Sequence, residues 1–148
     1  ARLRKFLHDE SGVAVIEFAL IGPTLLFMLL AAIDLGNVLS EREAMGHVLR
    51  SGAQMAMSDQ GGPAVLAAMQ GAASQRFVLT AGSKSSIALD ASRFCACPNA
   101  PATSTSCSTI CTGSVPTYIF YRMTATKTYN GILFPLINLA PVIQVQVR

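Results

Sequence analysis

The chain has 148 residues, of which 51% are hydrophobic and only 13% are charged, and its mean hydropathy is +0.46. This length leaves room for one modest domain besides a membrane segment, and so much apolar surface must be covered by lipid or by a partner. The net charge of +3 forms no basic stripe with interleaved aromatic residues, so we expect no nucleic-acid partner.

An apolar run covers residues 13–33 and is broken only by Glu17, Gly22, Pro23 and Thr24. As a helix, a run of about twenty residues spans about 30 Å, which is the thickness of the hydrocarbon core of a bilayer. The alternative is a buried helix of a soluble protein, but such helices rarely stay apolar on every face for so long. The run therefore predicts a single membrane-spanning helix.

The charges that flank this run predict its orientation. Arg2, Arg4 and Lys5 precede it, and the first charge after it is Asp34. The positive-inside rule places the N-terminus in the cytoplasm and exports everything beyond Asp34. A secretory signal peptide is the rival, although Ala31-Ala32-Ile33 offers only a poor cleavage site. We therefore expect a single-pass protein of the bacterial inner membrane whose C-terminal domain is periplasmic or extracellular.

Two helices are expected before any strand. Helical spacing of apolar residues continues past the membrane run, so one helix is predicted over residues 13–57. Residues 58–63 contain two glycines and a proline, which end this helix and begin a second one that runs to about Leu79. The apolar stripes are Val38, Met45, Val48, Leu49, Met55 and Ala56 in the first helix, and Val65, Leu66, Met69, Ala72, Ala73 and Phe77 in the second.

The second half of the chain has the period of strands. Ile87 and Leu89 alternate with polar residues, residues 118–129 are rich in β-branched and aromatic residues, and Asn130-Gly131 is a turn signal. Residues 143–147 alternate again and predict a final strand, whereas residues 132–141 are interpreted as an apolar loop packed on a neighbour. The expected fold is α+β, with a small antiparallel sheet. The domains expected are a leader over 1–12, a long helix over 13–57 with its membrane part at 13–33, and an extracytoplasmic domain over 58–148 with a disulfide loop at 95–111.

All four cysteines lie in one polar segment that cannot fold by apolar burial. A zinc site would use paired C-x-x-C spacing, but here the pairs are C-x-C and C-x-x-x-C, with no histidine nearby. An oxidising compartment favours disulfides instead. A bridge within the first pair would be strained, so crossed or nested links between the two pairs are expected, with no metal or other cofactor. The residues concerned are Cys95, Cys97, Cys107 and Cys111.

Glu17 lies a few residues inside the membrane run. Burying its carboxylate in lipid costs about 3 kcal/mol, so it needs a partner or a proton, unless it lies near enough to the interface to reach water. The segment around it has glycine at position 12 and glutamate five residues later, in the order Ser-Gly-Val-Ala-Val-Ile-Glu-Phe. This segment resembles the type IV prepilin processing site, where a membrane-embedded aspartic peptidase cuts after the glycine and leaves the glutamate fifth in the mature chain.

The longer N-terminal pattern resembles the TadE-like minor pilins of the Tad pilus system, within the type IV pilin superfamily. The particular features are Glu-Phe-Ala-Leu at residues 17–20, then Pro23 and a leucine-rich run. The resemblance implies processing between Gly12 and Val13, and assembly through Glu17, Phe18 and Pro23. Conventional type IV pilins begin with a phenylalanine-type residue where this chain has Val13, and this departure argues against the conventional branch but not against the Tad one.

The processing motif also has a physical rationale. Cleavage would expose a positive amine at Val13, and Glu17 of the same or a neighbouring helix can neutralise it where water is scarce. Pro23 has no N–H to donate to the carbonyl of Ala19, so we expect a kinked or softened helix there.

A structural subunit of a pilus is the predicted function, at the tip or base or in assembly, serving adhesion and surface colonisation. An enzyme is not expected, because neither His8 nor His47 has an evident nucleophile or metal set beside it. The alternative is an uncleaved envelope scaffold or adhesin. The resemblance implies as partners the major pilin, other minor pilins, the inner-membrane platform and the prepilin peptidase, besides the lipid bilayer.

Overall fold

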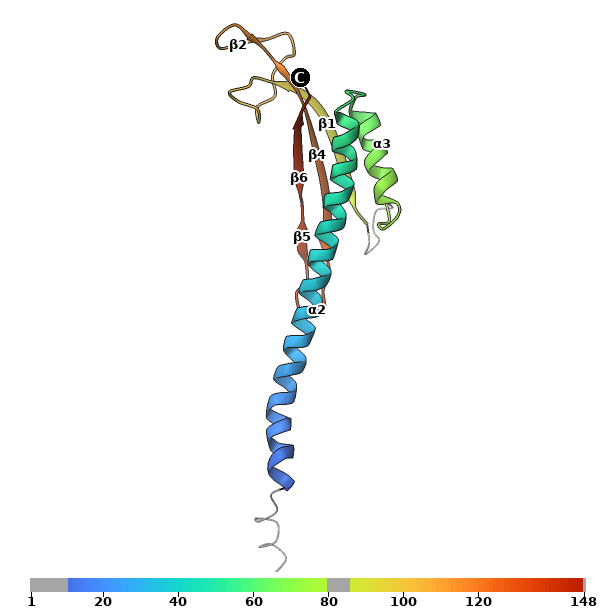
Figure 1. Ribbon diagram of the computed structural model, residues 1–148, viewed down its shortest axis with the longest axis vertical. Helices are drawn as coiled ribbons and strands as arrows, with labels where there is room; N and C mark the ends of the chain where they lie inside the picture. Colours follow the sequence, from blue (N-terminus) through green and yellow to red (C-terminus); the bar gives the residue numbers. More distant parts are fainter. Residues whose placement is uncertain (1–10, 80–85, 148) are drawn as a thin grey trace, which may run out of the picture.

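The computed structural model describes residues 11–79 and 86–147, with side chains from Ala14 onward. The fold is α+β: two helices pack on one face of a small antiparallel sheet, and the first helix extends far beyond the domain (Figure 1). The helices are α2 (Ser11–Ala56) and α3 (Gly62–Ala73). The strands are β1 (Ala88–Ala96), β2 (Ile110–Cys111), β3 (Val115–Pro116), β4 (Tyr118–Tyr129), β5 (Ile137–Leu139) and β6 (Val142–Gln146).

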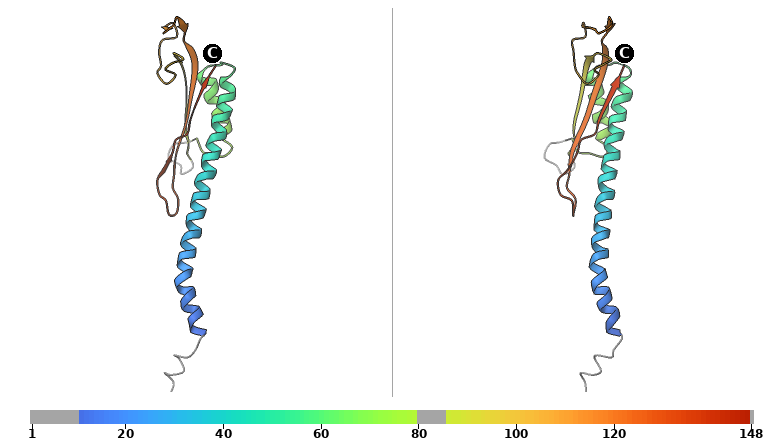
Figure 2. Two further views of the ribbon diagram at one scale, coloured as in Figure 1. Left: turned by 60° about the vertical axis from the view of Figure 1, so that its left-hand side comes forward. Right: turned by 90° about the vertical axis from the view of Figure 1, so that its left-hand side faces the viewer.

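The long strand β4 is the centre of the sheet. Strand β1 pairs with it along one edge, from Ala88 opposite Thr126 to Ala96 opposite Tyr118. Along the other edge β6 pairs with residues 120–124 of β4 and β5 pairs with residues 127–129. Because β5 and β6 follow each other along one edge, the β4–β5 hairpin extends past the rest of the sheet, beside α2 and toward its N-terminal half (Figure 2).

The two faces of β4 pack against different parts of the protein. Its odd-numbered residues Tyr121, Met123 and Ala125 are fully buried in the core with the helices, as the two-residue period of a strand requires. On the opposite face Phe120 stacks on Phe94 with ring centroids 5.8 Å apart. From α2 and α3 the core receives Ala44, Met45, Val48, Leu49, Ala56, Val65, Met69, Ala73 and Phe77.

The turn between the helices depends on two residues with positive φ. Asp59 and Gly61 have φ of 47° and 91°, and this left-handed backbone reverses the chain so that α3 runs back along α2. Close packing of the two helices uses Gly52, where an added Cβ would lie 2.6 Å from Cγ of Met69. The first helix ends at Ala56, one residue before the predicted boundary at residue 57.

Three sequence predictions need correction. The second helix ends at Ala73, not near Leu79: Phe77 turns into the core, and Val78 forms a bridge with Ser86. Residues 132–141 are not all loop, because residues 137–139 form β5 against the end of β4. Met55, which was placed on the apolar stripe, is exposed, since α3 covers the neighbouring face at Ala56.

Candidate functional site

The N-terminal part of α2 presents apolar side chains to its surroundings on every side. From Ala14 to Ala56 the helix contains an 18-residue window with a mean hydropathy of 2.2, none of which is buried inside the protein. Large exposed side chains occur all around it, among them Phe18, Leu25, Leu26, Phe27 and Leu29. This is the surface of a helix that is long and apolar enough to cross a bilayer.

The predicted processing and assembly residues lie along the start of this helix. Gly12 and Val13 are helical in backbone, and the basic residues of the predicted leader lie outside the described residues, as does His8. The carboxylate of Glu17 is exposed, with no ion pair among the residues that the structure describes. The ring of Phe18 lies over Gly22, where an added Cβ would be 3.7 Å from it. The helix continues through Pro23, and a kink there stays a prediction.

A buried carboxylate lies where the apolar run ends. Asp34 is only 1% exposed, and its oxygens accept hydrogen bonds from the tip of the β4–β5 hairpin. The backbone N–H of Ile132 donates to Oδ1 over 2.9 Å, and those of Leu133 and Phe134 donate to Oδ2 over 2.6 and 3.2 Å. The hydroxyl of Tyr129 donates to Oδ1 over 3.4 Å. One side chain of α2 therefore holds a whole hairpin turn.

These donors favour the charged form of Asp34. The N–H groups of Ile132 and Leu133 are the main cause of a lowered pKa of this carboxyl, opposed by burial, which raises it. The turn must also approach closely: a Cβ at Gly131 would lie 2.6 Å from Oδ2 of Asp34. Any larger residue at position 131 would displace the turn from the carboxylate.

A second buried charge joins α2 to the same strand. Nζ of Lys127 lies 2.7 Å from Oε2 of Glu41, and the Lys127 side chain is only 5% exposed. The ammonium also lies 4.9 Å from the centroid of the Phe77 ring. Because Lys127 follows the buried side of β4, its pairing with Glu41 satisfies a cation that would otherwise be buried without an acceptor.

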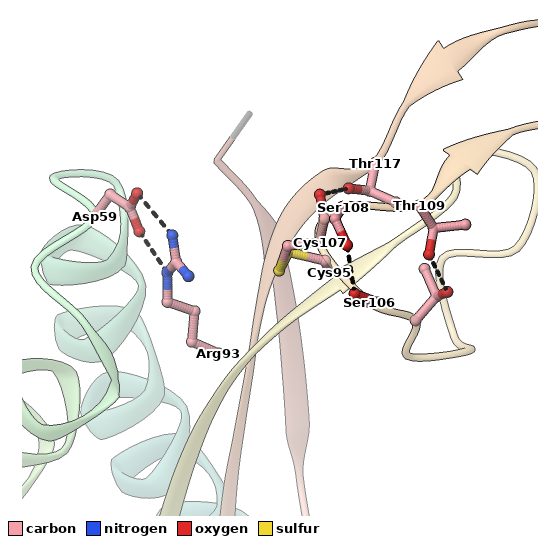
Figure 3. Close-up of a disulfide and its surroundings, with 9 residues drawn as sticks. Asp59, Arg93, Cys95, Ser106, Cys107, Ser108, Thr109 and Thr117 are labelled. Atoms are coloured by element: carbon pink, nitrogen blue, oxygen red, sulfur yellow. Dashed lines mark hydrogen bonds and ion pairs between the residues drawn. A yellow bond between two sulfur atoms is a disulfide. The ribbon is translucent and has the colours of Figure 1, made fainter.

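A polar cluster fixes the α2–α3 turn to the sheet (Figure 3). Arg93 on β1 donates two hydrogen bonds to the carboxylate of Asp59, over 2.9 and 3.2 Å. The hydroxyl of Tyr121 donates to the same carboxylate over 2.7 Å and accepts from the N–H of Gly61 over 3.0 Å. Burial raises the pKa of Tyr121, and the hydrogen bond to Asp59 raises the pKa of Arg93. The cluster holds the turn in place.

The cysteine loop lies at the far end of the sheet from Asp34. Its disulfides join Cys95 to Cys107 and Cys97 to Cys111, so the two links cross, which is one of the two expected arrangements. The Cys95–Cys107 link is drawn in Figure 3, close to the hydrogen bond that Thr117 donates to the carbonyl of Cys107. No cluster of metal-ligating side chains occurs among the described residues. The loop also folds over the sheet, since the side chain of Gln144 donates to the carbonyl of Pro101 over 2.7 Å.

Comparison with known families identifies the long helix. Residues 12–54 match the model of the family described as TadE-like protein. The chain carries a TadE-like helix. No curated protein and no solved structure matches the chain. The match begins at the predicted processing glycine and covers nearly all of α2, whereas the sheet and the cysteine loop lie outside it.

The TadE-like helix contains the candidate residues that the sequence motif predicts and one buried contact that the motif does not predict. The motif predicts Gly12, Glu17, Phe18 and Pro23, and these residues lie apart from the domain. In the sequence Asp34 is only the first charge after the apolar run, whereas in the structure it is the buried contact between the helix and the hairpin. Two features of the sequence are compatible with this contact but do not specify it: a lone carboxylate directly after the apolar run, and an Asn-Gly turn followed by an apolar segment without charges.

Proposed function

We propose that this protein is a minor pilin or pseudopilin, a structural subunit that helps to assemble a Tad-type pilus or forms part of its tip or base. Such a subunit serves adhesion and surface colonisation and is not an enzyme. The observation that carries the proposal is the TadE-like match over residues 12–54, which falls on a helix with an exposed apolar surface. Few roles other than insertion in lipid or packing among like helices suit such a surface.

Glu17 gives the proposal its chemistry. Its carboxylate stands among exposed apolar residues, where an unpaired charge is costly. Cleavage after Gly12 creates a positive amine at Val13, four residues away on the same helix and within reach of a neighbouring one. A pair between this amine and Glu17 removes two isolated charges from the apolar phase and sets the register between subunits.

The same proposal assigns location and partners. Residues 13–33 cross the inner membrane, residues 1–12 form a cytoplasmic leader, and the domain with its disulfides lies on the periplasmic side. The disulfides support this side, since they persist in oxidising compartments. The partners are the major pilin, other minor pilins, the inner-membrane platform and the prepilin peptidase.

A charge-neutral replacement at position 17 tests assembly. We expect Glu17→Gln to insert and fold as the wild type does but to co-purify poorly with pilus partners, because only the negative charge is lost. Glu43→Gln is the matched control: it makes the same change on an exposed residue of the same helix, outside the apolar run. Equal recovery of partners with wild type and Glu17→Gln would contradict the proposal.

A bulky residue at position 12 tests processing. We expect intact-mass measurement of wild-type protein from membranes to give a chain that begins at Val13, and Gly12→Leu to keep its leader. Gly36→Leu is the control, since an added Cβ at that glycine meets nothing within 4 Å. A wild-type protein that retains its leader while it resides in the membrane would instead identify an uncleaved envelope scaffold or adhesin.

A further inference from the structure

The tip of the β4–β5 hairpin exposes large apolar side chains. Ile132 is 68% exposed, Phe134 is 47% exposed and Leu136 is 70% exposed. We refer to residues 132–136 as the apolar tip. Exposure of such an apolar cluster to water is unfavourable in free energy, which indicates that lipid or another protein covers it.

The apolar tip is held at the level where the membrane run of α2 ends. Its backbone N–H groups bind Asp34, which directly follows Ile33, the last residue of the apolar run. The hairpin descends along α2 toward the exposed apolar half of that helix (Figure 2). If the helix crosses a bilayer over residues 13–33, the tip therefore lies at the boundary between the acyl chains and the headgroups.

The chemistry of the hairpin suits that boundary. Residues 128–147 include no Asp, Glu, Lys or Arg, so no charged side chain of the hairpin opposes contact with lipid. Four backbone N–H groups of the turn are bonded internally: those of Ile132, Leu133 and Phe134 bind Asp34, and that of Gly131 donates to the carbonyl of Phe134. A turn whose amides are already bonded loses little when it leaves water.

We infer that the apolar tip inserts into the periplasmic leaflet and gives the protein a second membrane contact, with Asp34 as its positioning residue. The inference rests on the proposed membrane placement of α2. Insertion of a few apolar side chains reaches about 5–10 Å into the headgroup and acyl boundary. The contact holds the domain close against the membrane in the unassembled subunit. A neighbouring subunit is the competing occupant, and the test distinguishes the two.

Tryptophan fluorescence provides the test, because the chain has no Trp and each variant then carries a single reporter. Full-length Phe134→Trp is reconstituted at high dilution into phosphatidylethanolamine and phosphatidylglycerol vesicles, with and without lipids brominated on the acyl chain. We expect blue-shifted emission and strong quenching by the bromolipid. Ile132→Trp repeats the measurement at a second tip position, in case either variant fails to fold.

Two reporters elsewhere make the outcomes distinct. Leu26→Trp on the apolar half of α2 reports whether the helix is in the bilayer, and Ile110→Trp on β2, in the cysteine loop, is an exposed control that should not be quenched. If the Trp at position 26 is quenched and those at positions 132 and 134 are not, the inference is overturned and the proposed membrane placement of α2 still holds. Absence of quenching at 26 overturns the proposed membrane placement itself. A tip reporter that becomes shielded only after pilus partners are added identifies a neighbouring subunit as the occupant and also overturns the inference.

Discussion

The two halves of α2 are both rich in apolar residues, yet they bury them in opposite ways. Leu26 in the N-terminal half is 58% exposed, whereas Leu49 in the C-terminal half is 1% exposed and lies in the core. The N-terminal half is apolar on all faces, whereas the C-terminal half has an apolar face and a charged face. Only the C-terminal half packs its apolar face on the sheet and on α3. The distribution of apolar residues around the helix, rather than their number, separates a surface for lipid from a surface for protein.

The largest effect is expected from truncating a leucine in the packed half. Leu49→Ala removes a fully buried side chain and should lower the free energy of unfolding of the domain by about 2–5 kcal/mol. Leu26→Ala makes the same truncation in the exposed half and should leave domain unfolding unchanged. Urea unfolding of the full chain in detergent, followed by near-ultraviolet circular dichroism, measures both. Equal destabilisation by the two variants would mean that the halves do not differ as described.

A smaller effect is expected at the buried ion pair. Glu41→Leu leaves the ammonium of Lys127 buried without its carboxylate, which should cost about 2 kcal/mol of unfolding free energy. The double variant Glu41→Leu with Lys127→Met removes both charges and should recover most of that loss. The same urea measurement on these two variants and on Lys127→Met alone gives the coupling energy between the two sites. A double variant as unstable as the sum of the single ones would show that the pair itself contributes nothing.

The smallest effect on global unfolding is expected at Asp34, because its hydrogen bonds hold only the hairpin tip. Its pKa is lower in the folded protein, so its stabilisation is complete above the ordinary carboxyl pKa of about 3.9 and is lost as the pH falls below that value through the folded pKa. At neutral pH Asp34→Asn removes the same charge. We expect faster hydrogen exchange at the amides of residues 132–134 in this variant.

The amide of Val147 is the internal control for that measurement, since it donates to the carbonyl of Ile119 far from the tip. Its exchange should be the same in wild type and Asp34→Asn. Unchanged exchange at residues 132–134 would count against Asp34 as the group that holds the hairpin, and faster exchange at Val147 as well would indicate general unfolding.

Sequence alone was enough for the elements whose pattern is local. Residues 118–129 combine β-branched and aromatic residues before an Asn-Gly turn, and the predicted strand has the observed bounds of β4. The second helix was predicted too long because Phe77 continues its apolar spacing, yet Phe77 enters the core from beyond the end of the helix at Ala73. Spacing does not reveal where a chain leaves a helix while still burying its side chains.

The contacts that organise the candidate site were beyond sequence reasoning for a different reason. The amide of Ile132 lies 98 residues from Asp34, and backbone N–H groups have no sequence signature. Likewise, crossed and nested cysteine links satisfy the same spacing, and only the path of the chain decides between them. The motif at Gly12 and Glu17 can be recognised from the sequence because its residues are close neighbours in the chain.

The position of β4 also determines how the domain responds to force. Its two ends lie at opposite ends of the sheet: Tyr129 binds Asp34 on the side of the N-terminal half of α2, and Tyr118 follows Thr117, which binds the cysteine loop. The strand runs along the long axis of the molecule (Figure 1), and the hydrogen bonds of an antiparallel ladder are perpendicular to the strands. Strands β1 and β4 both enter the cysteine loop at the same end of the sheet, where Ala96 lies opposite Tyr118. A pull between the N-terminal end of α2 and the cysteine loop therefore loads the contacts between α2 and the sheet, among them the ion pair of Glu41 with Lys127, before it loads the β1–β4 ladder.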